Sequence, residues 1–258
     1  MKRILHISDL HFGRIHPPAI KSLEDFLGKQ ENQIDLIVMT GDWTQRARRD
    51  QYQAASEFIT RAKVPVLTIP GNHDIPLYNF FARLLQPLRH YNRYVRNVTV
   101  DSFNDPEVVI VGFQTANQFR TVEGRILEKD IQRAQDLFGQ APADAVRIIA
   151  CHHPIFEPKH ISKIKPRHLV DAVLALKPDI VLSGHSHLTW IEQVETNQHK
   201  ILHISAGSAT SNRLRGEVNS FHIIETHSRQ VVIETFYLSE DGFILKKDQV
   251  KTTVDLKI

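Results

Sequence analysis

Five short polar motifs in this chain each follow an apolar run, and they combine aspartate, asparagine and histidine. These residue types suit Mn, Fe, Zn or Ni, and a pair of such ions is well adapted to hydrolysis at phosphorus. Nothing in the packing of a protein core requires them at five successive loop positions. The pattern therefore predicts a two-metal site that hydrolyses a phosphate ester. The motifs are Asp9-Leu10-His11, Gly41-Asp42, Gly71-Asn72-His73-Asp74, His152-His153 and Gly184-His185-Ser186-His187.

The spacing within the motifs indicates how their side chains would reach a common ion. Asp9 and His11 follow an extended run, and residues two apart on a strand project to the same face, so both side chains can reach one metal. His185 and His187 repeat that spacing. The glycines of the second and third motifs lack a Cβ, which permits a sharp turn that brings the next residue to the rim of the sheet. Open α/β sheets place their sites at that rim.

The elements that must position these motifs alternate over the first two thirds of the chain. Apolar runs without period-2 polarity are typical of strands buried on both faces, and residues 20–27, 52–62 and 169–176 have helical spacing between them. After Gly184 five strand-like runs follow without a helical pattern, which predicts an antiparallel sheet that pairs with or packs against the first. The expected strands are 4–8, 36–40, 65–69, 108–113, 146–151 and 180–183, then 189–195, 200–205, 220–225, 230–237 and 243–247.

Composition favours an ordinary intracellular enzyme. The 258 residues are 41% hydrophobic and 24% charged, from which we expect one domain over residues 1–258. The 32 basic and 29 acidic residues give a net charge of only +3, so no stable nucleic acid complex is expected. The single cysteine, Cys151, is expected to be a small buried strand residue. With no disulfide, secretory signal or membrane span in the sequence, we expect a cytoplasmic location.

The whole motif series resembles that of the calcineurin-like metallophosphoesterases, and it covers Asp9 to His187 in the right order. Within this superfamily the chain looks most like the compact bacterial branch near the cyclic-nucleotide phosphodiesterases, which carry a similar His-His-Pro at the fourth motif. The resemblance implies an α/β fold in which two mixed β-sheets pack as a sandwich flanked by helices, in the order α/β/β/α.

The resemblance also implies roles for individual residues. Two divalent or trivalent ions of Mn, Fe, Zn or Ni would share a bridging hydroxide that attacks phosphorus. His73 would contact the phosphate and protonate the leaving oxygen, and Asp74 would orient His73. At the fourth motif the family pattern favours His152 over His153 as the ligand. The first metal would take Asp9, His11 and His187, the second would take Asn72, His152 and His185, and Asp42 would bridge both.

The function expected first is a phosphodiesterase or phosphomonoesterase that acts on a small molecule such as a nucleotide. One alternative is a pyrophosphatase of the lipid A type that cleaves a UDP-sugar lipid, although its best-known branch has arginine where this chain has His73. A second is a nuclease of the double-strand-break repair type, which would be longer and more basic. The last is a metal-free scaffold of the kind found in retromer, which would have lost ligands that this chain retains.

Two further segments could contribute to the site. Residues 77–96 alternate aromatic and aliphatic residues with arginine directly after the third motif, so they could cap the site with a surface that contacts a membrane or a lipidic substrate. The other interpretation, which we expect, is a helix whose apolar stripe packs on the sheet while its arginines face solvent. Residues 207–209 and 213–216 follow a strand beyond the last motif and could line the cleft.

Overall fold

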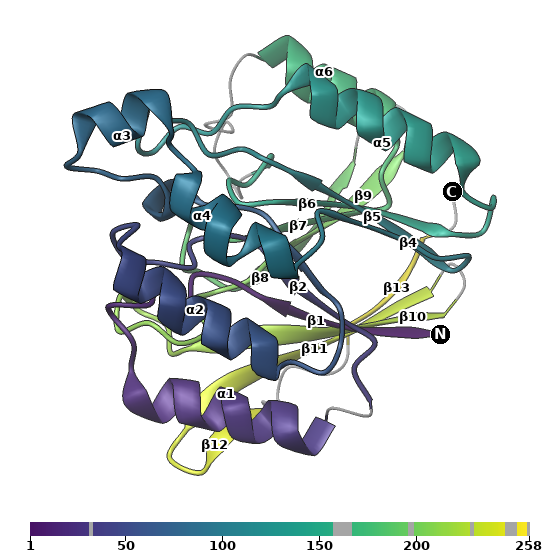
Figure 1. The fold of residues 1–258 in the computed structure, drawn as a ribbon. Helices are drawn as coiled ribbons and strands as arrows, with labels where there is room; N and C mark the ends of the chain where they lie inside the picture. The colour runs from purple at the N-terminus through teal and green to yellow at the C-terminus, as the bar shows by residue number, and fades with distance from the viewer. Residues whose placement is uncertain (31–32, 157–166, 196–198, 228–229, 246–251, 257–258) are drawn as a thin grey trace.

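The structure is a computed structural model, and it describes residues 1–30, 33–156, 167–195, 199–227, 230–245 and 252–256. Two β-sheets pack face to face, and helices cover the outer face of each (Figure 1). The α/β/β/α sandwich expected from the sequence is therefore confirmed. The helices are α1 (Pro17–Gln30), α2 (Arg49–Arg61), α3 (Phe80–Leu85), α4 (Arg89–Tyr94), α5 (Glu128–Gln140) and α6 (Arg167–Ala175), with single 3₁₀ turns η1 (Asn72–Asp74) and η2 (Arg96–Val98).

The first sheet has the strand order β12-β11-β10-β1-β2-β3, and β13 pairs with β11 beyond this path. β1, β2 and β3 run parallel, whereas β10, β11, β12 and β13 join by antiparallel pairing. Its strands are β1 (Lys2–Ile7), β2 (Leu36–Met39), β3 (Val66–Thr68), β10 (Ser220–His227), β11 (Gln230–Ser239), β12 (Gly242–Leu245) and β13 (Thr252–Asp255).

The second sheet has the strand order β4-β5-β6-β7-β9-β8. Four central strands run parallel, and the edge strands β4 and β8 are antiparallel to their neighbours. Its strands are β4 (Ser102–Asn104), β5 (Val108–Phe113), β6 (Val146–Cys151), β7 (Ile180–Ser183), β8 (Trp190–Glu195) and β9 (Lys200–Ser205).

The continuous apolar runs are explained by burial on both faces of each strand. In β1, Ile4 points into the core between the two sheets, whereas Leu5 and Ile7 pack toward α1 and α2. β2 alternates in the same way, with Leu36 and Val38 between the sheets and the intervening residues facing the helices. Because successive side chains point to opposite faces, a strand covered on both sides needs apolar residues at every position.

The prediction of one antiparallel sheet in the C-terminal third is wrong. β10 to β13 extend the first sheet, but β8 and β9 belong to the second, where β9 pairs parallel with β7. β8 and β9 form an antiparallel pair, so the chain reverses twice after β7 and β9 returns in the direction of β7. Leu202 and Ile204 of β9 join the core between the sheets. Each expected strand is present, although residues 246–247 of the last run lie outside the described residues.

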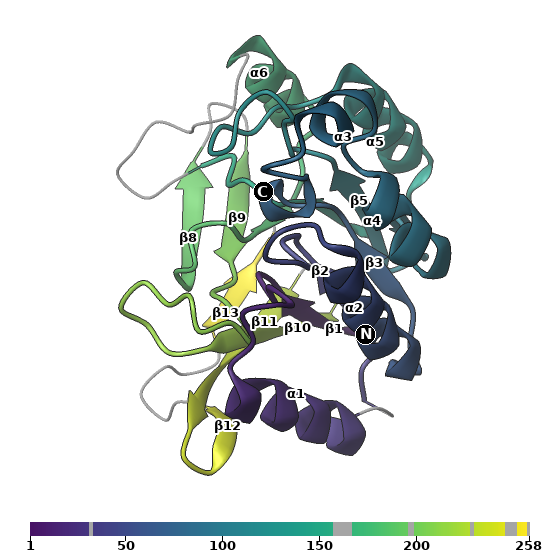
Figure 2. The same cartoon turned by 60° about the vertical axis from the view of Figure 1, so that its left-hand side comes forward.

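The expected packing of residues 77–96 is correct only for their second half. Tyr91 of α4 is buried against α2, and Val95 is buried after it. All six residues of α3 are described, however, and none is buried. Figure 1 and Figure 2 show α3 standing at the edge of the fold, on the side where the parallel strands end. Residues 77–96 do not form the single helix expected from the sequence, because a break around Pro87 separates the two short helices α3 and α4.

Candidate metal centre

The five motifs meet at one edge of the sandwich. Asp9, Asp42 and Asn72 follow the carboxyl ends of β1, β2 and β3 in the first sheet, while His152 and His185 follow β6 and β7 in the second. These strands run parallel within each sheet, so their carboxyl ends lie at the same rim, as the sequence predicted. Both sheets therefore contribute side chains to the same site.

The backbone at this rim is not extended, which corrects the expectation drawn from strand geometry. Asp9 and His11 have φ angles of 54° and 52°, and His185 and His187 have φ angles of 68° and 56°. Left-handed backbone costs a non-glycine residue roughly 1–3 kcal/mol, and such residues cluster at functional sites. Hydrogen bonds from the loop after β2 hold the first pair, since Asp9 N donates to Gly41 O at 3.1 Å and His11 N to Asp42 O at 3.0 Å.

Two glycines permit the loops to approach each other closely. Gly41 has a φ of +93°, and a Cβ there would lie 2.7 Å from Nδ1 of His152. Gly71 has an extended backbone, but a Cβ there would lie 2.1 Å from Oδ1 of Asp42. The expected sharp turn therefore applies to Gly41, whereas Gly71 is required by proximity to Asp42.

The first cluster of ligand atoms combines Asp9, His11, Asp42 and His187, whose candidate atoms all lie within 4.8 Å of one another. Nε2 of His187 lies 3.2 Å from Nε2 of His11 and 3.2 Å from Oδ1 of Asp9. That carboxylate oxygen is buried and has no hydrogen-bond partner among the described residues. Oδ2 of the same carboxylate is anchored, because Ser8 Oγ donates to it at 2.6 Å and His185 N at 3.0 Å.

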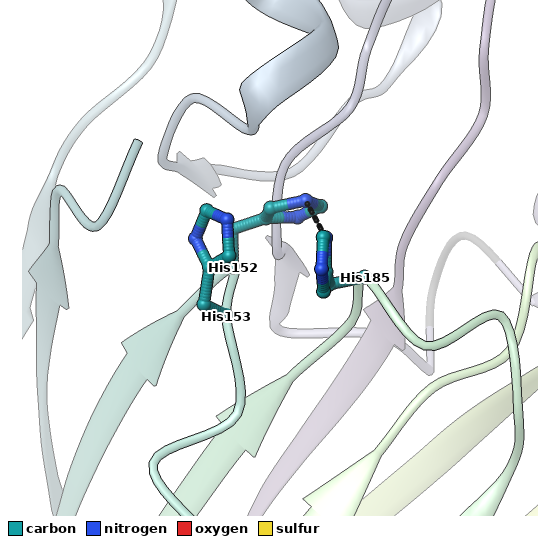
Figure 3. Close-up of side chains that lie close together, drawn as sticks. All are labelled: His152, His153 and His185. Atoms are coloured by element: carbon teal, nitrogen blue, oxygen red, sulfur yellow. Dashed lines mark hydrogen bonds between the residues drawn. The ribbon is translucent and has the colours of Figure 1, made fainter. Parts of the chain in front are cut away.

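The second cluster is formed by His152, His185 and Asn72. Oδ1 of Asn72 lies 3.0 Å from Nε2 of His152 and 3.0 Å from Nδ1 of His185. The two ring nitrogens are 3.3 Å apart, and Figure 3 marks this interaction between the His152 and His185 rings. The His153 ring packs on the His185 ring with 4.4 Å between centroids, and its Nδ1 lies 2.9 Å from Thr115 Oγ1. The candidate ligand atoms of His152, His153 and His185 lie within 4.8 Å of one another, and Nε2 of His153 is buried with no hydrogen-bond partner among the described residues. The structure therefore brings both histidines of the fourth motif beside His185, and His152 is the one that lies within hydrogen-bond distance of Asn72.

Asp42 lies between the two clusters. Its Oδ2 is 3.6 Å from Nε2 of His11, and its Oδ1 is 3.5 Å from Nε2 of His152. The N–H of His73 donates to the Asp42 Oδ1 at 2.8 Å, which fixes the orientation of the carboxylate. Among the predicted ligands, Asp42 has one carboxylate oxygen near the first cluster and the other oxygen near the second.

Backbone carbonyls behind two histidines set their tautomers. Nδ1 of His152 lies 2.7 Å from the Thr40 carbonyl oxygen, and Nδ1 of His187 lies 2.6 Å from that of Arg213. Since a carbonyl only accepts, each Nδ1 carries a hydrogen, and Nε2 is the nitrogen of each ring that is left to bind an ion when it is unprotonated. Imidazole nitrogens beside an unpartnered buried carboxylate oxygen form a donor set of the kind that binds metal ions, so these residues fit such ions.

The pKa shifts of the two buried carboxylates, Asp9 and Asp42, also fit the binding of metal ions. Burial alone would raise the pKa of Asp9, but His187 and His11 beside it hold that pKa well below its usual range. Burial likewise opposes ionisation of Asp42, and the neighbouring His152 and His73 lower its pKa overall. Both side chains are therefore ionised at neutral pH, as ligation of a cation requires.

His73 lies at the mouth of the site, in η1. Its Nδ1 is 2.9 Å from the Gln45 carbonyl oxygen, and its Nε2 accepts a hydrogen bond from Arg213 Nη1 at 2.8 Å. Burial lowers the pKa of His73, and the Arg213 cation adds to that effect. His73 is thus neutral, with its Nε2 facing the cavity side of the site.

The Asp74 carboxylate makes its hydrogen bonds with groups other than the His73 ring, so the expectation that Asp74 orients His73 stays a prediction. The Asp74 carboxylate accepts hydrogen bonds from the N–H groups of Gly71, Trp43 and Thr44 at 2.9, 3.1 and 3.0 Å. It is buried and ties the third motif to the loop after β2. The ring of His73 is oriented by the Gln45 carbonyl, which carries no sequence signal because every residue has one.

A cavity of about 610 Å³ opens over both clusters. Asp42, Asn72 and His73 line its floor together with His185 and His187. Arginines line its wall, and these include Arg213 and Arg215 of the segment expected to reach the cleft, together with Arg46. A cavity of this size suits a nucleotide-sized ligand.

Among the residues that the structure describes, no helix is long and apolar enough to cross a bilayer.

The chain is similar in sequence to two enzymes of named activity. It is 26% identical over 208 residues to the 3',5'-cyclic adenosine monophosphate phosphodiesterase of Escherichia coli strain K12, covering 72% of this chain and 69% of that protein. It is 21% identical over 220 residues to the UDP-2,3-diacylglucosamine hydrolase of Shewanella halifaxensis, covering 78% and 88%.

The fold has counterparts among solved structures. The purple acid phosphatase PPD1 from yellow lupin matches with a TM-score of 0.71 and 11% identity, over 98% of this chain and 53% of that chain. The sequence profile of the calcineurin-like phosphoesterases matches residues 2–188, which include all five motifs. The chain therefore belongs to the calcineurin-like phosphoesterases, a family of dinuclear, metal-dependent phosphoester hydrolases.

Proposed function

We propose that the chain hydrolyses a phosphodiester bond in a small molecule of nucleotide size. The observation that carries the proposal is the position of Asp42 between two clusters of inward-facing histidines, directly below a cavity lined by arginines. Two bound ions would activate a water molecule and neutralise charge on the phosphate oxygens. The first would be held by Asp9, His11 and His187, the second by Asn72, His152 and His185, and Asp42 would contact both.

The other side chains of the site act on the substrate. Arg213 lies in the cavity wall beside His73, so its guanidinium can bind a phosphate oxygen by a charge-assisted hydrogen bond. When it does so it leaves Nε2 of His73, and the negative phosphate then favours protonation of that nitrogen. Nδ1 stays bound to the Gln45 carbonyl, so Nε2 is the atom that delivers a proton to the leaving oxygen.

A diester substrate is supported by the relatives. The cyclic adenosine monophosphate phosphodiesterase matches 72% of the chain, and the size of the cavity suits a cyclic nucleotide. A nucleoside diphosphate linked to a lipid is the second candidate, supported by the match over 88% of the diacylglucosamine hydrolase and by the exposed apolar side chains of α3 near the cavity. A metal-free scaffold is disfavoured, because all seven proposed ligands meet at one rim.

The experiment compares turnover of 3',5'-cyclic AMP, bis-p-nitrophenyl phosphate and p-nitrophenyl phosphate with Mn added. Asn72→Ala should lose metal and all diester turnover. His73→Ala should keep its metal and lose about 10²–10⁴-fold on cyclic AMP, but less on the p-nitrophenyl diester, whose leaving group needs little protonation. Asn92→Ala and His227→Ala, both at exposed positions, are the matched controls. Parent-like diester turnover in Asn72→Ala would contradict the assignment of the site.

A chelator provides the complementary test. Removing the metal should abolish turnover but leave the circular dichroism spectrum largely intact, because the core between the sheets is apolar and independent of the ligands. Global unfolding on chelation would show that the centre is required for the fold.

A further inference from the structure

A cluster of large apolar side chains is exposed beside the cavity. Among the described residues, the most exposed large hydrophobic side chains are Tyr78, Phe81, Leu85, Phe119 and Phe80, with exposed fractions of 78%, 74%, 73%, 68% and 67%. Four of the five belong to α3 or to the turn that precedes it. These five residues are called the α3 surface below. A soluble monomer rarely exposes so many large apolar side chains together unless they contact another surface.

The exposure is built into the fold and does not arise from a frayed helix. The Asn79 side chain caps α3 by accepting a hydrogen bond from Ala82 N at 2.9 Å. Arg83 Nε donates to the Gln118 carbonyl at 2.6 Å, and its Nη1 donates to the Pro76 carbonyl at 3.2 Å. These bonds fix α3 to the loop that carries Phe119, so the apolar side chains of both segments are presented together.

The charge around the α3 surface is strongly positive. Residues 77–96 contain four arginines and no aspartate or glutamate, although the whole chain has a net charge of only +3. Arg48 and Arg89 line the groove beneath α3 and are exposed, and Arg46 stacks over the Tyr78 ring at 5.5 Å. Asp74 is the one carboxylate among the described residues that line this groove, and it is 1% exposed.

Aromatic and aliphatic side chains ringed by arginine complement a surface that is apolar within and anionic at its border. An anionic phospholipid bilayer has this chemistry, since rings and aliphatic side chains enter the headgroup region while guanidinium groups contact lipid phosphates. The charge of the surface therefore favours an anionic bilayer as the partner.

The α3 surface adjoins the catalytic cavity. Leu77 and Arg46 line both the groove beneath α3 and the cavity over the candidate metal centre. Figure 2 shows α3 facing the viewer on the side where the strands of both sheets end. A molecule held at the bilayer through α3 would therefore present the mouth of its cavity close to the lipid headgroups.

We propose that the α3 surface docks the protein on anionic phospholipid membranes. Tyr78, Phe80, Phe81, Leu85 and Phe119 enter the headgroup region, and the exposed Arg48 and Arg89 beside the groove beneath α3 contact lipid phosphates. The proposal does not depend on the proposed catalytic function, because it rests on surface residues outside the metal centre.

The test is flotation of the intact protein with vesicles of phosphatidylcholine and phosphatidylglycerol, compared with phosphatidylcholine alone. The parent should float with the anionic vesicles, and salt should weaken binding. Phe81→Asp and Leu85→Asp should each lower the partition coefficient about tenfold or more, because each removes apolar burial and adds a repelled charge. Ile244→Asp on β12, at a position 48% exposed, is the matched control and should float like the parent.

Both α3 variants change exposed side chains, so circular dichroism and hydrolysis of bis-p-nitrophenyl phosphate should remain at the parent's level. Chelated protein should also float, which separates a failure of this proposal from a failure of the proposed function. The proposal is overturned if the parent stays out of the anionic vesicle fraction, or if Phe81→Asp floats as well as the parent. Formation of a dimer that Phe81→Asp abolishes, without vesicle binding, would assign the surface to a second copy of the chain.

Discussion

Replacing Gly71 with alanine should damage the metal centre through a single methyl group. The added Cβ would lie 2.1 Å from Oδ1 of Asp42 and 2.4 Å from its backbone N, whereas ordinary contacts begin at 3.4 Å. Asp42 would therefore have to move by 3.4 − 2.1 = 1.3 Å. It cannot move freely, because the same Oδ1 accepts the N–H of His73 at 2.8 Å and Asp42 itself has a φ of 55°.

The size of the effect follows from this displacement. A shift of about 1 Å in a positioned catalytic group can cost about 10² in rate, and overpacking a dense site costs about 1–3 kcal/mol of stability. We expect kcat/KM on bis-p-nitrophenyl phosphate to fall at least about a hundredfold in Gly71→Ala. Metal content, measured by plasma mass spectrometry, should fall with it, because Asp42 is proposed to contact both ions.

Gly139→Ala is the matched control. Gly139 lies on the exposed side of α5, and a Cβ there meets nothing within 4 Å. This variant should keep full activity, and its free energy of unfolding should stay equal or rise by up to about 1 kcal/mol from helix propensity. Parent-like turnover and metal content in Gly71→Ala would refute the reasoning, since they would mean that the loops after β2 and β3 can separate without harm to the centre.

Two further predictions concern the cavity wall and the core. Arg213→Ala should lower kcat/KM about 10- to 100-fold, because it removes one charge-assisted hydrogen bond to the phosphate. Arg213→Lys should restore part of the lost kcat/KM. Metal content should stay unchanged, because the Arg213 carbonyl still holds His187; loss of metal would contradict this division of roles. The second prediction is acid lability, since burial between the sheets lowers the pKa of His222 to about 4. A pKa below the unfolded value means that the contribution to stability is present above about pH 6.5 and is lost as pH falls toward the folded pKa. Between about pH 7.5 and 5, His222→Gln should therefore lose about 2 kcal/mol less unfolding free energy in urea than the parent. Identical pH slopes for the two proteins, with exposed His227→Gln as control, would show that His222 is not held neutral.

The positions of the proposed ligands at the rim of the sheets could be predicted because each follows a buried strand. The apolar composition of a run such as Val146–Cys151 predicts a buried strand, and His152, directly after that strand, must then lie at the rim of the sheet. The strand predictions therefore brought the correct loops together. Local geometry could not be predicted in the same way, since the left-handed backbone of Asp9 and His11 is imposed by hydrogen bonds from a loop about 30 residues away.

Contacts through the backbone and contacts between distant segments account for most of the errors. The carbonyl groups of Thr40, Gln45 and Arg213 orient three histidines of the site, and no side-chain pattern reveals a carbonyl. The motif predicts that Asp74 orients its neighbour His73, but the Asp74 carboxylate accepts hydrogen bonds from Gly71 of the same motif and from Trp43 and Thr44 of the loop after β2. The apolar spacing around Phe81 resembles a buried stripe, and only the tertiary structure shows that the Phe81 side chain is 74% exposed.

The distribution of ligands over both sheets links the core of the sandwich to the chemistry. Asp9, Asp42 and Asn72 are carried by the first sheet and His152 and His185 by the second, so each proposed metal position is completed across the sandwich. The apolar core between the sheets consequently sets the distance between the two halves of the site. Because packed interiors respond to the loss of even one methylene, side-chain truncation in this core should alter the metal centre before it unfolds the protein.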